Sequence, residues 1–163
     1  TRDVLYLEDV NARLFGGIVN ADAQFRLGQP GAYEARCAFF HLDIARCIRE
    51  LELEKKVEMS GTVSGELAVR GTGGELALLS GRLRSQDAGG RLVIKDTAFL
   101  KNLAERSGQP MDLLMENIAD YEYNKAYATA ELEDGAIVLK TLLDGAGGKR
   151  DLTVKLHGVT TRR

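Results

Sequence analysis

The chain of 163 residues has no tryptophan, only two prolines and two histidines, and a formal net charge of −2. It also lacks an apolar run of the roughly 18 residues that a membrane-spanning helix needs. A nearly neutral chain has no overall attraction to nucleic acid or to an anionic membrane surface. The two cysteines, Cys37 and Cys47, are too few for a disulfide framework. They form either one disulfide or two buried thiols, and we favour the thiols.

Residues that usually carry catalysis or bind metals are scattered in this sequence. His41 and His157 lie far apart, and neither has a nucleophile nearby at motif spacing, so we expect surface or strand-edge histidines. The glycine runs at 71–74 and 145–148 precede strand patterns, whereas a phosphate loop requires a following helix. The sequence therefore predicts no catalytic residue, no metal site and no cofactor.

Three tyrosines are predicted to share one face of a strand at 121–132: Tyr121, Tyr123 and Tyr127. They form either a stacking platform for a ligand or nucleic acid, or aromatic packing across strands. Acidic neighbours such as Glu122 disfavour nucleic acid. We favour packing, and we expect no nucleic-acid partner.

Glycine, by contrast, is abundant, with 18 residues. Within residues 61–96 one pattern occurs three times: a glycine turn, a short run of alternating apolar and polar residues, and another glycine turn. Alternation gives a strand one apolar and one polar face. Gaps of turn length between such runs favour an antiparallel meander over a parallel sheet with crossover helices.

The rest of the chain extends this pattern and interrupts it twice with helical spacing. Further strands are predicted at residues 4–7, 10–15, 17–27, 32–40, 121–132, 136–142 and 152–157. Helices are predicted at 44–56, capped by Asp43, and at 97–108, capped by Asp96 or Thr97, followed by a short helix that Pro110 opens. We therefore predict one domain over residues 1–163, mainly β or α+β. It is a long curled antiparallel sheet, a meander, with two or three short helices packed on one face.

The apolar face of the repeated strands is the candidate binding surface. Left open, it forms an apolar groove suited to acyl chains; covered by the helices, it is an ordinary core. The sequence leaves both alternatives standing. The candidate lining residues are Val63, Leu67, Val69, Leu79, Leu83, Leu92 and Ile94.

Two stretches carry a resemblance to a known family. The first, at 33–96, combines the strand ending in Phe-Phe-His-Leu-Asp, a short helix and the glycine-bounded strands. The second, at 115–158, combines Glu-Asn-Ile-Ala-Asp-Tyr-Glu-Tyr with strands, a Glu-Asp-Gly turn and Leu-Lys-Thr-Leu-Leu-Asp-Gly. This layout resembles the C-terminal parts of the AsmA-like proteins of Gram-negative bacteria, a group that includes TamB and YdbH.

The resemblance implies a non-enzymatic protein of the cell envelope. Such proteins are anchored in the inner membrane, cross the periplasm as a curled sheet with an apolar groove, and move phospholipid or maintain the outer membrane. The chain begins at Thr1 without an initiator Met, so we interpret it as a C-terminal fragment of such a protein. The expected partners are a phospholipid or another acyl lipid, and neighbouring segments of the parent protein or an envelope partner.

Two other functions remain open. One is a structural or protein-interaction module that pairs through its sheet edges. The other is a hydrolase of an envelope polymer, with paired carboxylates that only the fold would assemble.

Overall fold

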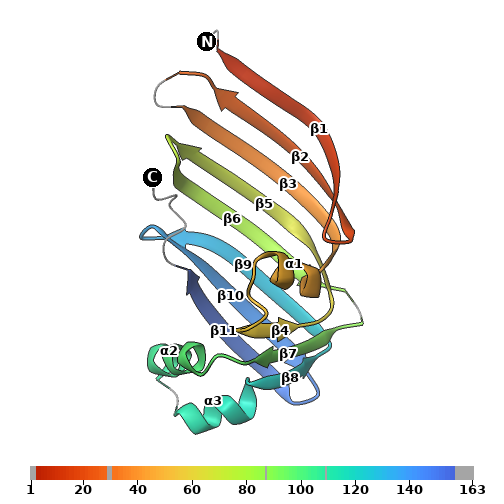
Figure 1. The fold of residues 1–163 in the computed structure, drawn as a ribbon, viewed down its shortest axis with the longest axis vertical. Coiled ribbons are helices and arrows are strands. Elements are labelled where there is room, and N and C mark those ends of the chain that lie inside the picture. The colour runs from red at the N-terminus through yellow and green to blue at the C-terminus, as the bar shows by residue number, and fades with distance from the viewer. Residues whose placement is uncertain (1–2, 29–30, 87, 109, 157–163) are drawn as a thin grey trace.

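A computed structural model describes residues 3–28, 31–86, 88–108 and 110–156. Within these ranges the chain is mainly β, with two antiparallel sheets and three short helices (Figure 1). This confirms the predicted fold class. The predicted long antiparallel sheet is the larger of the two, and the second, smaller sheet was not predicted.

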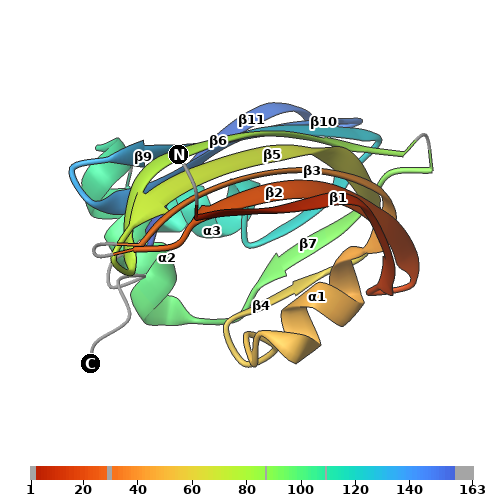
Figure 2. The same cartoon turned by 90° about the horizontal axis from the view of Figure 1, so that it is seen from above.

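The large sheet has eight antiparallel strands in the order β1-β2-β3-β5-β6-β9-β10-β11. It curls into an arch, and the small sheet and the helices lie on its concave side (Figure 2). Its strands are β1 (Val4–Leu14), β2 (Gly17–Arg26), β3 (Ala32–Asp43), β5 (Thr62–Thr72), β6 (Glu75–Ser85), β9 (Lys125–Glu133), β10 (Ala136–Gly145) and β11 (Gly148–Leu156).

The small sheet consists of β4 (Val57–Met59), β7 (Gly90–Ile94) and β8 (Asp120–Tyr123), in the order β4-β7-β8. The third glycine-bounded run is β7, so it does not continue the meander, and β6 pairs with β9 instead. Backbone packing explains the position of β7. A Cβ atom on Gly89 would overlap the carbonyl oxygen of Tyr123, and one on Gly90 would overlap that of Ser60. Only glycine allows the chain to pass between these neighbours.

The predicted strand at 121–132 was also wrong as a single element. It breaks at Asn124 into β8 of the small sheet and β9 of the large one. The Asn124 amide donates to the carbonyl oxygen of Asp144 at 2.8 Å. This bond fixes the point where the chain passes from one sheet to the other.

The helices are α1 (Ile44–Glu50), α2 (Thr97–Ser107) and α3 (Met111–Asn117). The predicted N-caps are confirmed: Asp43 accepts a hydrogen bond from the Arg46 amide at 3.2 Å, and Asp96 caps α2 in the same way. Helix α1 is shorter than predicted. It stops at Glu50 because the chain turns away there, with Glu52 at a φ of 55°, outside the helical range.

Three β-bulges hold the apolar residues on one face of the large sheet. In β1 the pairing shifts between Leu7 and Val10, so the predicted strands at 4–7 and 10–15 form one strand. Further shifts fall between Phe39 and Leu42 in β3 and between Leu76 and Leu78 in β6, opposite Arg70 and Gly71 of β5. A one-residue insertion reverses the alternation of the residues that follow it. The bulges therefore correct the places where strict alternation would turn apolar side chains outward.

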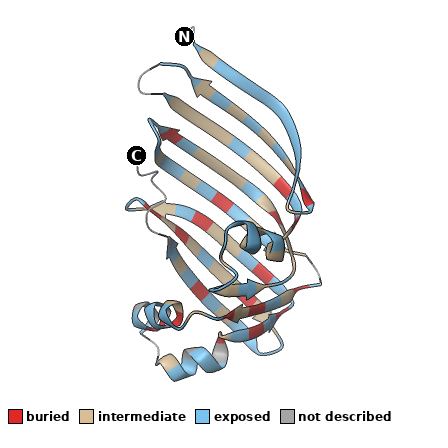
Figure 3. Cartoon of the chain, in the orientation of Figure 1, coloured by how far each residue is buried: buried red, intermediate tan, exposed pale blue. Residues whose placement is uncertain are grey.

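The hydrophobic core lies between the small sheet, helix α2 and the last strands of the large sheet. Its buried members are Leu92, Ile94, Leu100, Ala104, Ile118, Tyr121, Tyr123, Ala126, Leu143 and Leu152. Figure 3 shows buried residues on the small sheet and on the strands of the large sheet beside it, whereas β1 is almost entirely exposed. The core therefore sits at one end of the arch.

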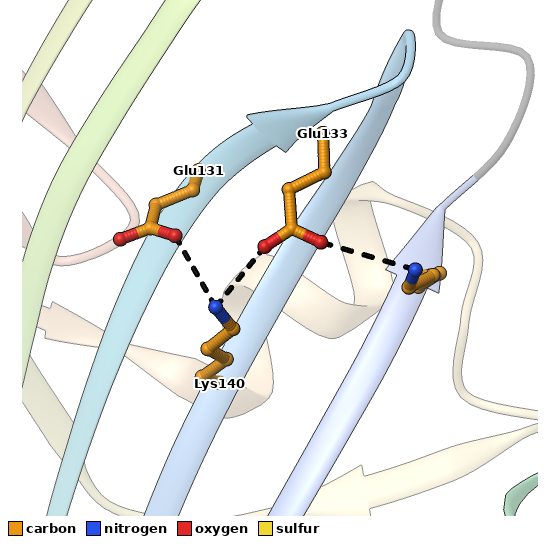
Figure 4. A network of polar contacts seen from close by, with 4 residues as sticks. Glu131, Glu133 and Lys140 are labelled. Atoms are coloured by element: carbon orange, nitrogen blue, oxygen red, sulfur yellow. Dashed lines mark hydrogen bonds and ion pairs between the residues drawn. The ribbon is translucent and has the colours of Figure 1, made fainter. Parts of the chain in front are cut away.

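The convex side of β9–β11 carries an exposed ion-pair network (Figure 4). The Lys140 Nζ atom lies 3.3 Å from Glu131 and 3.0 Å from Glu133, and Lys155 lies 3.8 Å from Glu133. These hydrogen bonds raise the pKa of Lys140, with Glu133 the larger influence. The polar side of the sheet thus faces solvent.

Candidate functional site

Strand register shows which side chains share a face of the large sheet. Residues directly opposite each other in antiparallel strands project to the same side. Two such rows run across the sheet. One is Val10, Ala21, Cys37, Leu67, Gly81, Ala130, Leu139 and Val154; the other is Ala12, Val19, Phe39, Gly65, Leu83, Ala128, Thr141 and Leu152.

Neither row contains a charged residue, and we call the face that carries them the inner face. Leu152 and Ala126 of this face belong to the core beneath the small sheet, so the inner face is the concave one. The alternate row on the outer face is Asn11, Asn20, Ala38, Glu66, Arg82, Thr129, Lys140 and Thr153. The rows on the two faces therefore differ in polarity, and the outer face also carries apolar side chains such as Phe40 and Leu142.

Solvent exposure divides the inner face into two sections. In β1, Leu5, Leu7 and Val10 are 48%, 41% and 41% exposed, and most inner-face side chains of β2, β3, β5 and β6 are half-buried. We call this part the open section. In β10 and β11, Leu143 is 1% exposed and Leu152 is 9% exposed. With Ala126 they form the sealed section.

The structure brings together five of the seven predicted lining residues. Val63, Leu67 and Val69 on β5, and Leu79 and Leu83 on β6, all project to the inner face and are half-buried. Leu92 and Ile94 lie on β7 inside the core. The five residues belong to the open section, and the remaining two belong to the layer that covers the sealed section.

Most of the open section was not assigned from the sequence. Its missed members include Leu5, Leu7, Ala21, Ala35 and Cys37, on β1, β2 and β3. Their alternation was visible, and it predicted strands. Which strands lie beside β5 depends on register and pairing, which no local pattern provides.

Both cysteines are free thiols and half-buried. Cys37 lies in an inner-face row opposite Leu67, and burial raises the pKa of its thiol. Burial also raises the pKa of Cys47 on α1, with a smaller contribution from Asp43. A thiol held protonated is a weak nucleophile, so Cys37 contributes an apolar side chain to the open section.

The prediction that three tyrosines share a face was wrong. Tyr121 and Tyr123 are buried on β8, whereas Tyr127 is 51% exposed on the outer face of β9. The Tyr123 hydroxyl donates to the carbonyl oxygen of Ser60 at 2.5 Å, and the Tyr121 hydroxyl donates to that of Gly148. Burial raises the pKa of Tyr123 to about 12. Tyr121 and Tyr123 are thus core residues with satisfied hydroxyl groups.

Other chemistry on the described part of the chain is sparse. No three His, Cys, Asp or Glu side chains are grouped there in a way that would hold a metal ion. His41 is exposed at the bulge of β3, where its amide donates to Ser64 Oγ at 3.0 Å; His157 lies outside the described residues. A hollow of about 500 Å³ on the outer face is lined by polar and apolar residues in similar measure, among them Asp22 and Arg36.

None of the helices in the described ranges is long and apolar enough to span a membrane. The chain thus contributes a sheet whose concave face carries no charged side chain over β1, β2, β3, β5 and β6 and is partly exposed there.

Comparison with known proteins identifies the family. The family model for YdbH-like proteins, described as intermembrane phospholipid transport protein YdbH, matches residues 2–150. Neither the curated proteins nor the solved structures gave a match. Because the matched region covers most of the chain, the protein belongs to the YdbH-like family of intermembrane phospholipid transport proteins.

Proposed function

We propose that the open section of the inner face binds the acyl chains of a phospholipid, and that this chain is a non-enzymatic segment of an envelope lipid-transfer protein. The observation that carries the proposal is that the open section of the inner face has no charged side chain and remains partly exposed over β1, β2, β3, β5 and β6. Soluble proteins rarely leave so continuous an apolar surface uncovered unless it binds something.

The energetics favour an apolar occupant. Burying one CH₂ group contributes about 0.8 kcal/mol, so even a partly shielded acyl chain gains several kcal/mol. A charged headgroup would lose hydration on the open section without finding a partner of opposite charge there. The headgroup is therefore expected to remain in solvent while the acyl chain lies on the sheet.

Membership of the family supports a proposal on where this lipid transfer takes place. Transport between two membranes takes place in the cell envelope, and we propose a periplasmic position for this segment within a longer, inner-membrane-anchored protein. The polar outer face suits an aqueous compartment. The groove proposed here is one section of a longer apolar path.

Lipid extraction and native mass spectrometry of the purified chain test the proposal. Protein purified without detergent should retain phospholipid, seen as a mass increment on the folded chain and as phospholipid in the organic extract. An outer-face variant, Arg82→Gln, provides a control that should retain the same lipid. Protein that carries no lipid and takes none up from phospholipid vesicles would overturn the proposal.

A second function is favoured by the sheet edges. Within the part of the chain that the structure describes, each edge strand of the large sheet, β1 with 11 residues and β11 with 9, pairs with a neighbour on one side only. Unpaired edges are templates for further strands, from the parent protein or from an envelope partner. Deleting residues 4–15 should abolish partner capture in a pull-down; unchanged capture would exclude pairing through β1.

A further inference from the structure

We propose that the groove has a closed end within this chain. The small sheet, with helices α2 and α3, forms what we call the end layer, and this layer stops an acyl chain at the β6–β9 boundary. The inference rests on the proposed function. It adds that lipid occupies the open section only. The lipid then leaves along the strand direction, past the strand ends, and does not pass across β9–β11.

The first observation is what occupies the inner face beyond β9. Leu143 of β10 and Leu152 of β11 project to this face and are buried in one core with Leu92, Tyr121 and Tyr123 of the small sheet. At the Gly145 end of β10 and beside it in β11, where Val154 packs against the same core, protein side chains thus take the space that an acyl chain would need. On β1, at the other end of the same face, Leu5 and Leu7 are exposed.

The second observation is that the end layer is fastened to the large sheet at several points. The Tyr121 hydroxyl donates to the carbonyl of Gly148 in β11, and the guanidinium of Arg150 lies 5.5 Å from the centre of the Tyr121 ring. A Cβ atom on Gly145 would overlap the carbonyl oxygen of Glu122, so the two backbones touch directly. These contacts attach β8 of the end layer directly to β10 and β11 of the large sheet. The end layer is therefore a fixed part of the fold, since a mobile lid would lack such contacts.

The third observation is the length that remains. The open section crosses five neighbouring strands, β1, β2, β3, β5 and β6. With about 4.8 Å between strands, the path across them is about 19 Å long. Acyl chains lying across the strands would therefore meet the end layer after a short path, and the way out passes the ends of β5 and β6.

Site-specific photo-cross-linking tests the closed end. p-Benzoylphenylalanine replaces one half-buried inner-face residue at a time: Ala35 in β3, Leu79 in β6 or Val154 in β11, which packs against the core of the end layer. Each full-length variant is incubated with vesicles of phosphatidylethanolamine and phosphatidylglycerol that contain radiolabelled phosphatidylethanolamine. The outer-face position Arg36 supplies the background, and circular dichroism confirms that each variant is folded.

The closed end predicts strong labelling at positions 35 and 79, with labelling at position 154 reduced to the background at position 36. Labelling at position 154 equal to that at position 35 would overturn the closed end while leaving lipid binding intact. Background labelling at all three inner positions would instead overturn the proposed function. Labelling by an unfolded variant is recognised by its spectrum, and Thr141 of β10, which lies opposite the buried Leu152, then replaces Val154 as the distal position.

Discussion

The open and sealed sections share one sheet and one sequence pattern, yet only one of them has a core. Both alternate small or apolar residues with polar ones, and one register row passes through both, from Val10 to Val154. They differ because the small sheet and α2 fold back over β9–β11 and leave β1–β3 largely uncovered. Alternation thus decides which face is apolar, and a separate segment decides whether that face is core or binding surface.

The largest expected effect tests that contrast in packing. Leu143→Ala in the sealed section should lower the free energy of unfolding by about 2–5 kcal/mol, because it leaves a cavity in an enclosed core. Leu7→Ala in the open section should cost about 1 kcal/mol or less, since that side chain is already 41% exposed. Urea denaturation followed by circular dichroism measures both. Equal losses would remove the distinction between the two sections.

The next effect concerns alkaline pH and reports on the sealed section alone. Burial raises the pKa of Tyr123 from 10.0 to about 12, so the folded state favours the neutral phenol. Its contribution is complete below pH 10 and is lost as pH rises toward 12, by about 2–3 kcal/mol. Tyr123→Phe should flatten the fall of unfolding free energy between pH 10 and 12. An unchanged slope in this variant would contradict the account of the buried hydroxyl.

Helix capping gives a smaller contrast. Asp96 caps α2 of the end layer with bonds from the Ala98 and Phe99 amides at 2.8 and 3.3 Å. Asp96→Ala should cost about 0.5–2 kcal/mol. Asp43→Ala on α1 removes one bond of 3.2 Å and should cost less. Amide hydrogen exchange of each helix, measured in its own variant and in the unmodified chain, would show the difference. A larger increase in exchange for α1 in Asp43→Ala than for α2 in Asp96→Ala would contradict this ranking.

The smallest effect lies on the outer face of β9–β11. Lys140→Met removes the exposed ion pairs with Glu131 and Glu133. Exposed pairs contribute little and are screened by salt. The midpoint of unfolding should fall slightly at low salt, and the difference should disappear at about 1 M salt. A large, salt-independent loss would mean that this face has a role in packing.

The sequence predicted the strands and caps well because their signals are local. Alternation located β2, and the acidic residues Asp43 and Asp96 marked the starts of helices. The turn before β10 was also expected, and Asp134 and Gly135 there have φ angles of 49° and 76°, as a two-residue hairpin requires.

Sheet membership could not be predicted in this way. The run that became β7 has the same alternation as β5 and β6, and only its neighbours place it in another sheet. For the same reason, Leu92 and Ile94 were grouped with Leu79 and Leu83. Local patterns assign a face to each strand, whereas strand pairing and coverage depend on distant residues.

The measurement that tests the central claim most directly compares two matched alanines on neighbouring strands. Ala35 projects to the inner face of β3 and Ala68 to the outer face of β5, and both are half-buried. Binding of phosphatidylethanolamine with a fluorescent acyl chain is titrated for Ala35→Glu, Ala68→Glu and the unmodified chain, with thermal unfolding as the check on folding. If the open section holds acyl chains, Ala35→Glu should weaken binding about tenfold or more, and Ala68→Glu should leave it unchanged. Equal binding by the two variants, or no binding by the unmodified chain, would contradict the claim.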